Sequence, residues 1–204
     1  MSDPQTKAEL VAALTQVQNA LTQTVQAMPN EQFNSGTAQS WSASGYLQHL
    51  ILSVKPFGKA MKLPAEQLRK TFGKPEQPSR TYAQLVAAYK ARLEEGVRAE
   101  DYEAITPVTY RFPEGMDDKK QYLVDTWNDA NNRLLQALES WTEEDLDTYQ
   151  LPHPAVGMLT VREMLFFTVY HNTMHWHDIE QASEKAKMGR SVAQASKRKS
   201  GASP

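Results

Sequence analysis

The chain has 204 residues, a formal net charge of −2 at pH 7 and no cysteine. A chain of this length can bury one sizeable core, and we expect a single compact domain at residues 1–185. The small net charge does not indicate a nucleic-acid partner, and the lack of thiols excludes disulfides, a thiolate zinc site and a cysteine nucleophile.

The two ends of the chain are polar. The amino terminus has no hydrophobic segment typical of a signal peptide, and the densest apolar run, residues 164–169, is far too short to cross a membrane. We therefore expect a cytoplasmic protein without a membrane partner. Residues 186–204 combine basic with small residues and contain no acid, so we predict a flexible basic tail there, in preference to a nucleic-acid-binding arm.

Two amphipathic helices are predicted in the first part of the chain, near residues 4–28 and 42–61. In the first, apolar side chains recur every three or four positions, and its expected start combines the capping carboxylate of Asp3 with Pro4. Ser42 is the expected N-cap of the second helix. The polar segment between the two is expected to be little more than a turn, so the second helix should return antiparallel to the first.

Residues 63–116 form a long excursion before the next bundle helix. Within it, residues 81–97 have an amphipathic pattern that begins with a capping box of Thr81 and Gln84. Residues 105–112 contain β-branched and aromatic side chains, but the prolines in and beside this segment indicate an irregular loop. An excursion of this length can carry the chain from one end of a bundle to the other, which would make the helices on either side of it parallel.

Two further long helices are predicted near residues 118–140 and 160–183. Paired aspartates place negative charge at the amino end of the first, and Thr160 with Glu163 forms a capping box for the second. Between them we expect a capped turn followed by a loop at residues 151–157. The chain as a whole predicts an all-α fold, a four-helix bundle with a long helical crossover between the second and third bundle helices.

The last predicted helix carries two histidines, His171 and His175, on its inward-facing stripe. Because four residues make about one helical turn, the two imidazoles lie on one face and can bind one metal ion. Histidines on a buried face are desolvated and need a partner, although satisfied core histidines produce the same spacing. His49, at the edge of the buried side of the second helix, is a third candidate ligand, with a hydrogen-bonded flanking histidine as the alternative.

Three other polar residues near these positions have alternative roles. His177 belongs to a different row of the last helix and is expected to serve packing or an interface. His153 lies in the proline-bounded loop and is expected to be structural. Asp178 follows His175 by about one turn, where it could orient that imidazole or a bound water, or form a helix cap or a surface ion pair.

Two stretches together carry a family resemblance. The segment Trp-Ser-Ala-Ser-Gly-Tyr-Leu-Gln-His-Leu at residues 41–50 precedes the long crossover, and Val-Gly-Met-Leu-Thr-Val-Arg-Glu-Met-Leu-Phe-Phe-Thr-Val-Tyr-His-Asn-Thr-Met-His ends at residue 175. This arrangement resembles the DinB/YfiT superfamily of metal-binding four-helix bundles over about residues 9–183. The resemblance implies that His49, His171 and His175 hold one divalent metal. It also implies thiol-dependent transferase or isomerase chemistry. The helix in the crossover and Asp178, where relatives often have Gln, are departures that change the pocket and the surroundings of the metal.

Three neutral imidazoles would leave the full charge on a divalent metal, zinc or nickel first of all, and would leave coordination positions open, as in catalytic sites. Together with what the resemblance implies, this leads us to expect a transferase in which a low-molecular-weight thiol attacks a small electrophilic substrate. A hydrolase that uses metal-bound hydroxide, with Asp178 as base, is one alternative, and a bundle that binds a metal or small ligand without turnover is another. A homodimer is also expected, because the last helix is apolar on more than one side, around Phe166, Phe167 and Tyr170.

Overall fold

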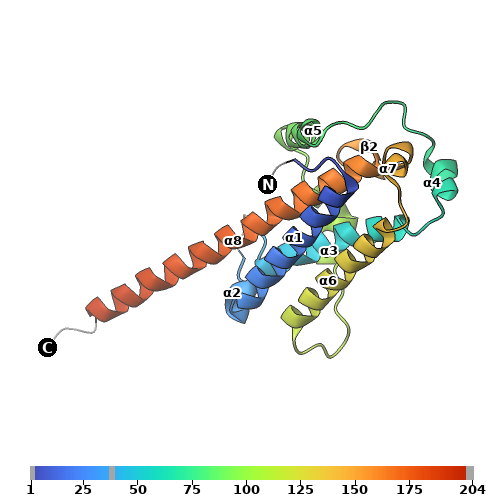
Figure 1. The fold of residues 1–204 in the computed structure, drawn as a ribbon. Coiled ribbons are helices and arrows are strands. Elements are labelled where there is room, and N and C mark those ends of the chain that lie inside the picture. The colour runs from blue at the N-terminus through green and yellow to red at the C-terminus, as the bar shows by residue number, and fades with distance from the viewer. Residues whose placement is uncertain (1–2, 37–39, 201–204) are drawn as a thin grey trace.

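Four long helices form the bundle in the computed structural model of the chain (Figure 1). The structure describes residues 3–36 and 40–200, with side chains described up to residue 181 and at residue 183. The all-α four-helix bundle predicted from the sequence is confirmed. Its long helices are α1 (Lys7–Ala27), α3 (Ala43–Ala60), α6 (Lys119–Leu138) and α8 (Val161–Ser200).

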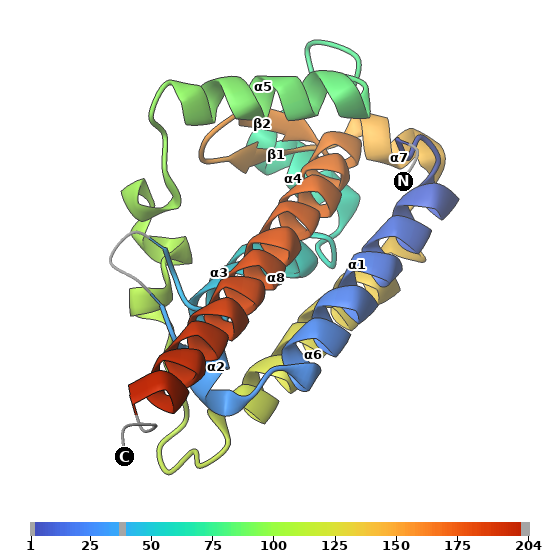
Figure 2. The same cartoon turned by 90° about the vertical axis from the view of Figure 1, so that its left-hand side faces the viewer.

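The long crossover returns the chain to the end of the bundle at which α3 begins. Figure 2 shows α1 and α8 running toward one end, whereas α6 starts at that end and runs back, and α3 runs the same way as α6. The helices on either side of the crossover are therefore parallel, as the length of the segment predicts. The crossover contains α4 (Ala65–Phe72), α5 (Tyr82–Glu94) and the 3-10 turns η1 (Ala99–Asp101), η2 (Glu103–Ile105) and η3 (Pro107–Thr109).

The expected caps account for most helix starts, with one correction at α1. The Ser42 hydroxyl accepts a hydrogen bond of 3.1 Å from the backbone N–H of Gly45, as predicted. At α1, however, Thr6 is the N-cap, so the predicted start at Asp3 is wrong. Thr6 and Glu9 form a reciprocal capping box, in which the Glu9 carboxylate accepts from the Thr6 N–H at 2.9 Å. That pair satisfies two free N–H groups of the first turn, which a single aspartate before it would not.

Three short helices and one hairpin lie in segments for which no helix or strand was predicted. The connector after α1 contains the helix α2 (Asn30–Asn34), the crossover contains α4, and the expected capped turn before residue 150 is the helix α7 (Glu143–Thr148). The loop predicted at residues 151–157 is wrong as well. It is a hairpin of β1 (Gln150–His153) and β2 (Gly157–Thr160), in which Leu151 pairs with Leu159 and both are buried. Burial of these two leucines stabilises a pairing that is too short to show in the periodicity.

The helix α8 continues past its predicted end at residue 183 as far as Ser200. Good helix formers such as Ala, Lys, Arg and Gln prevail in the added segment, which explains why it can stay helical. The flexible tail at residues 186–204 stays a prediction, because its side chains, and all of residues 201–204, lie outside the described residues.

The crossover helix α5 covers the aromatic side chains of α8. The ring of Tyr82 packs against Phe166 with centroids 5.7 Å apart, and the ring of Tyr89 packs against Phe167 at 5.0 Å and Tyr170 at 6.1 Å. Of the rings that led us to expect a homodimer, Phe166 and Phe167 are buried and Tyr170 is partly buried, so their apolar character does not require a second chain. The homodimer stays a prediction.

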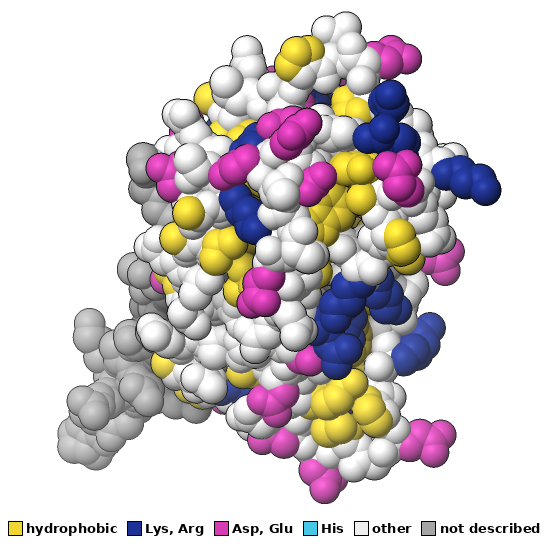
Figure 3. Space-filling model, turned by 45° about the vertical axis from the view of Figure 1, so that its right-hand side comes forward, with side chains coloured by type: hydrophobic (Ala, Val, Ile, Leu, Met, Phe, Trp, Pro, Cys, Tyr) yellow, Lys and Arg dark blue, Asp and Glu magenta, His cyan; other side chains and the backbone are white. Residues whose placement is uncertain are grey.

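The face of the molecule seen in Figure 3 carries acidic and basic side chains interspersed with apolar ones. No histidine of the described part of the chain is visible on this face. None of the described helices is long and apolar enough to cross a membrane. The histidines of the described part of the chain therefore lie in the interior of the bundle or on its other faces.

Candidate metal centre

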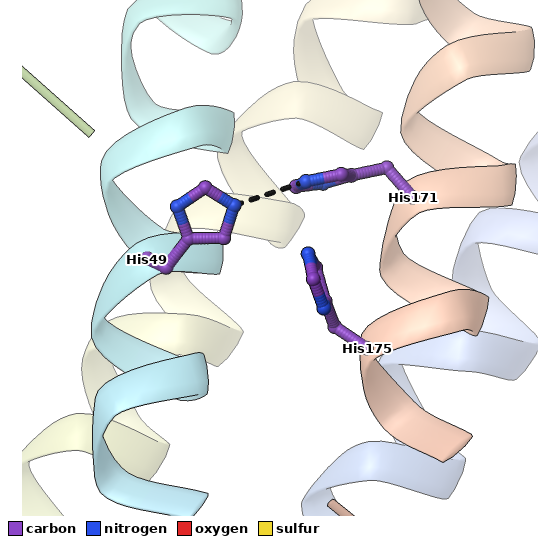
Figure 4. Close-up of side chains that lie close together, drawn as sticks. All are labelled: His49, His171 and His175. Atoms are coloured by element: carbon purple, nitrogen blue, oxygen red, sulfur yellow. Dashed lines mark hydrogen bonds between the residues drawn. The ribbon is translucent and has the colours of Figure 1, made fainter. Parts of the chain in front are cut away.

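Three histidines from two helices converge inside the bundle. His49 projects from the middle of α3, and His171 and His175 project from successive turns of α8 (Figure 4). One ring nitrogen of each residue lies within 4.8 Å of a ring nitrogen of the other two. His49 and His171 are buried, with exposed fractions of 1% and 4%, so water does not satisfy these rings. The structure therefore brings together the three ligands that the sequence predicts, although whether they bind a metal stays a prediction.

The crossover sets the tautomer of His49. Its Nδ1 lies 2.7 Å from the backbone carbonyl oxygen of Ile105, which can only accept a hydrogen bond, so Nδ1 carries the proton. The other nitrogen, Nε2, then has a free lone pair, and it lies 3.0 Å from Nε2 of His171. Because Nε2 of His49 carries no proton, Nε2 of His171 donates this hydrogen bond, and a metal ion would take the same lone pair of His49.

A carboxylate on the same helix sets the tautomer of His175. Its Nδ1 donates a hydrogen bond of 2.8 Å to Oδ2 of Asp178, which leaves Nε2 as the free ligand atom. Metal-binding histidines commonly donate their second N–H to a carboxylate or a carbonyl in this way. This contact agrees with two of the roles considered for Asp178, the orientation of His175 and an ion pair, and the choice between them stays a prediction.

Burial keeps two of the imidazoles neutral. Desolvation, followed by the nearby His175, lowers the pKa of His49 from 6.5 to about 4. Desolvation also holds the pKa of His171 well below its usual range, with His175 and His49 adding to the effect. Because only the neutral imidazole offers a lone pair to a cation, both rings are in the ligand form near neutral pH. The three imidazole donors and the tautomers of His49 and His175 fit a divalent metal such as zinc or nickel, whereas His171 would give up the hydrogen bond that it donates to His49.

A cavity of about 980 Å³ opens beside the three histidines. Most of its wall is apolar or aromatic, and it lies between α3, α5, α8, the hairpin and the 3-10 turns of the crossover. Tyr46 stands at its edge with its ring 5.2 Å from that of His175, and its hydroxyl lies 3.2 Å from Oγ of Ser40. A cavity of this size and composition suits a small organic molecule that reaches the histidines from one side.

The remaining two histidines of the chain lie apart from the cluster. His177 is about half exposed, its Nδ1 donates to Glu180 at 3.1 Å, and its ring stacks on Trp176. The packing or interface role expected of His177 stays a prediction. His153, for which we predicted a structural role, lies in the hairpin and also lines the cavity.

Sequence reasoning missed part of the wall and support of this site. Ile105 acts through its backbone carbonyl, and no side-chain pattern reveals such a contact. Phe167 stacks on His171 with ring centroids 4.9 Å apart, and its place one turn before that histidine was a signal for this contact. Asn172 is fully buried next to His171 and also lines the cavity.

A family model described as the DinB superfamily matches residues 13–179. The chain belongs to the DinB superfamily. The fold of this DinB-superfamily chain is similar to a solved structure, that of YfiT from Bacillus subtilis, described as a probable metal-dependent hydrolase with an unusual four-helix bundle topology. The TM-score is 0.58 and the identity 16%, over 92% of this chain and 93% of that chain, so the likeness concerns the fold alone. A comparison with curated proteins gave no match.

Proposed function

We propose that this DinB-superfamily chain is a metal-dependent transferase in which an external low-molecular-weight thiol attacks a small electrophilic substrate. The observation that carries the proposal is the convergence of His49, His171 and His175 at the wall of a large, mainly apolar cavity. A divalent cation held by these three imidazoles would act as a Lewis acid and would lower the pKa of a thiol bound to it.

The residues of the chain orient the metal-binding imidazoles and exclude water from the cavity. His49 donates a hydrogen bond to the Ile105 carbonyl and His175 donates one to the Asp178 carboxylate, so the tautomers and orientations of two of the three imidazoles are fixed before a cation is bound. The apolar wall excludes water from the electrophile. A free thiol with a pKa of about 8.5 is roughly 3% ionised at pH 7, so complete ionisation gains at most about thirtyfold. Any larger acceleration must come from the placement of nucleophile and electrophile side by side in the cavity.

The carboxylates near the cavity favour a thiol over water as nucleophile. Asp178, the base that a hydrolase would use, does not line the cavity and already accepts the hydrogen bond of His175. Among the described residues, the acids that line it are Glu94 and Glu100, from the end of α5 and the turn η1. A thiol, which ionises more readily than water, depends less on a protein base.

Hydrolysis is the second candidate, and one observation favours it. YfiT, whose fold is similar, is described as a probable metal-dependent hydrolase. Water would then replace the thiol at the same three histidines. If no reaction is found, the third candidate function is the binding of a metal or a small ligand without turnover.

A two-way omission experiment separates these functions. The protein is loaded with zinc or nickel and assayed with a panel of thiols against epoxide, halide and maleyl-type electrophiles. Chelation of the metal and omission of the thiol should each abolish turnover, and both together should cost no more than either alone, because the two act as one unit. Metal-dependent turnover that persists without any thiol would contradict the transferase and support the hydrolase.

A matched pair of variants shows that the reaction occurs at the proposed site. His175→Ala removes one of the three proposed ligands, whereas His177→Ala removes an exposed histidine two positions along the same helix. Turnover should be lost in the first variant and retained in the second. Equal turnover in both would place the reaction elsewhere.

A further inference from the structure

The hairpin histidine, His153, has a single possible tautomer. Its Nδ1 lies 3.2 Å from the backbone nitrogens of both Ala155 and Val156, and both of these groups are N–H donors. Since Nδ1 must accept from them, it cannot carry a proton, and the proton of the neutral ring lies on Nε2. Burial supports the neutral form, because desolvation lowers the pKa of His153 from 6.5 to about 4. The side chain is thus an obligatory hydrogen-bond donor at Nε2.

The orientation of this donor is also fixed. The ring of His153 packs edge-on against Phe167 with centroids 4.1 Å apart, and Tyr89 contacts it at 6.4 Å. The two hydrogen bonds to the hairpin hold the Nδ1 side of the ring, so Nε2 points away from the turn. Rotation of the ring would break both hydrogen bonds and both aromatic contacts.

The donor has no partner within the described part of the chain. No described side chain or backbone group accepts a hydrogen bond from Nε2 of His153. The atom is also not fully enclosed by the protein. It is therefore accessible, and His153 is one of the residues that line the cavity beside the three-histidine cluster. The ring of Phe167 contacts both His171, with centroids 4.9 Å apart, and His153, with centroids 4.1 Å apart. His153 and the cluster thus border the same cavity.

We infer that His153 is a substrate-binding residue whose Nε2–H donates to a neutral acceptor oxygen, so that the cavity selects apolar compounds with a carbonyl group. This inference rests on the proposed use of the cavity as the substrate site. An ionised carboxylate would lose its hydration for one neutral donor, whereas a ketone, ester or amide carbonyl loses little and matches one N–H with one oxygen. A hydrocarbon of equal size would leave Nε2–H without a partner.

Two conservative variants separate this role from the structural role of the ring. In His153→Asn, Oδ1 takes the place of Nδ1 and can still accept from the hairpin, but the donor at Nε2 is gone. In His153→Gln, the side-chain amide places an N–H near the position of Nε2, and the acceptor for the hairpin is gone. If His153 only supports the hairpin, His153→Asn should behave like wild type. If His153 binds the substrate, His153→Gln should behave like wild type instead.

The test compares 2-acetylnaphthalene with 2-ethylnaphthalene, which have similar size and differ in one carbonyl oxygen, by equilibrium dialysis against the metal-free protein. The ratio of the affinity for the ketone to that for the hydrocarbon should be about fivefold higher in wild type than in His153→Asn, because that variant lacks the donor and one hydrogen bond contributes about this factor. The ratio should return toward the wild-type value in His153→Gln. No binding of either probe, or the same ratio in wild type and His153→Asn, would each overturn the inference.

A second measurement reports on the tautomer without any ligand. Nitrogen-15 NMR of the histidine side chains should show His153 protonated on Nε2 and unprotonated on Nδ1 at pH 7, and a proton on Nδ1 would overturn the inference. Neither measurement needs metal, thiol or turnover. A ketone preference without any turnover would count against the proposed transferase alone, and turnover without the preference would count against the role of His153 alone.

Discussion

Asp178 accepts a hydrogen bond of 2.8 Å from Nδ1 of His175, about one turn earlier on α8. A second pair, His177 and Glu180, repeats the same spacing on the same helix at 3.1 Å, but it lies on the exposed side. The two pairs differ in what the histidine faces. Nε2 of His175 points toward His49 and His171, whereas the ring of His177 stacks on Trp176.

The first prediction concerns the support of His175 by Asp178. Replacement of Asp178 by Ala should weaken zinc binding about 10- to 100-fold, because the imidazole loses the acceptor that fixes its tautomer and orientation. Competition with a chelator of known affinity measures the effect. The matched control, Glu180→Ala, removes the carboxylate of the exposed pair and should bind zinc as wild type does. If the two variants bind zinc equally well, Asp178 does not support a ligand.

The second prediction concerns metal content. Wild-type protein loaded with zinc or nickel and then desalted should retain one ion per chain, and His175→Ala should lose it, because one of three protein ligands is gone. Elemental analysis measures the ratio directly. His177→Ala should keep the ion. Unchanged metal content in His175→Ala would show that the three histidines are structural.

The third prediction is that acid destabilises the metal-free protein. His49 and His153 have pKa values of about 4 in the folded protein, against about 6.5 in the unfolded chain. Between these values the unfolded chain binds more protons, so the free energy of unfolding rises with pH. The stabilisation is complete above about pH 6.5 and is lost progressively toward pH 4. Urea unfolding should show a loss on the order of 1–3 kcal/mol between pH 7 and pH 5.

A histidine variant serves as the control for this pH dependence. His49→Gln removes one of the three histidines whose pKa the fold lowers, so its free energy of unfolding should change less between pH 7 and pH 5 than that of wild type. The surface carboxylates with lowered pKa values, such as Glu143 and Asp147, contribute only at more acidic pH. A free energy of unfolding that is the same at both pH values in wild type would contradict the neutral, desolvated state of these imidazoles.

The fourth prediction concerns the contact that ties the crossover to the start of α8. The carboxylate of Glu163 is buried, and it accepts hydrogen bonds from Nε of Arg80 at 2.7 Å, from the Arg80 backbone N–H at 2.9 Å and from the Thr160 N–H at 3.0 Å. Glu163→Ala should lower the free energy of unfolding by about 2 kcal/mol, because these donors lose their acceptor. Urea unfolding at pH 7 measures the change.

An exposed ion pair provides the comparison for Glu163. Asp129 and Arg133 form a pair of 2.8 Å on α6, and both side chains are more than half exposed. Asp129→Ala should change the free energy of unfolding by less than about 0.5 kcal/mol, because water replaces the lost interaction. If both variants lose the same small amount, the buried carboxylate does not hold the crossover.

The sequence determines what depends on neighbours a few positions apart. The periodicity of apolar residues predicted the four bundle helices and the crossover helix, and the capping boxes at Thr81 and Thr160 predicted where two of them begin. The pairing of His171 with His175, and of His175 with Asp178, also follows from helical spacing. Each of these features is local, because the geometry of a helix alone relates the residues involved.

Short elements escaped this reasoning for a physical reason. The helices α2 and α4 and the hairpin contain few residues, so their apolar pattern is too brief to distinguish from that of a loop. They form because they pack against the bundle: Phe33 in α2, Leu68 in α4 and Leu159 in the hairpin are all buried. Their stability comes from tertiary contacts, which local propensity does not contain.

Only the tertiary structure decided how the site is assembled. His49 and His171 are separated by 122 positions, and packing of α3 beside α8 brings their Nε2 atoms to 3.0 Å. The carbonyl of Ile105 that orients His49, and the hairpin that places His153 in the cavity, reach the site through the course of the crossover and the pairing of two short strands. Helical spacing relates residues on one helix only, whereas the arrangement of separate segments depends on the burial of all their apolar faces at once.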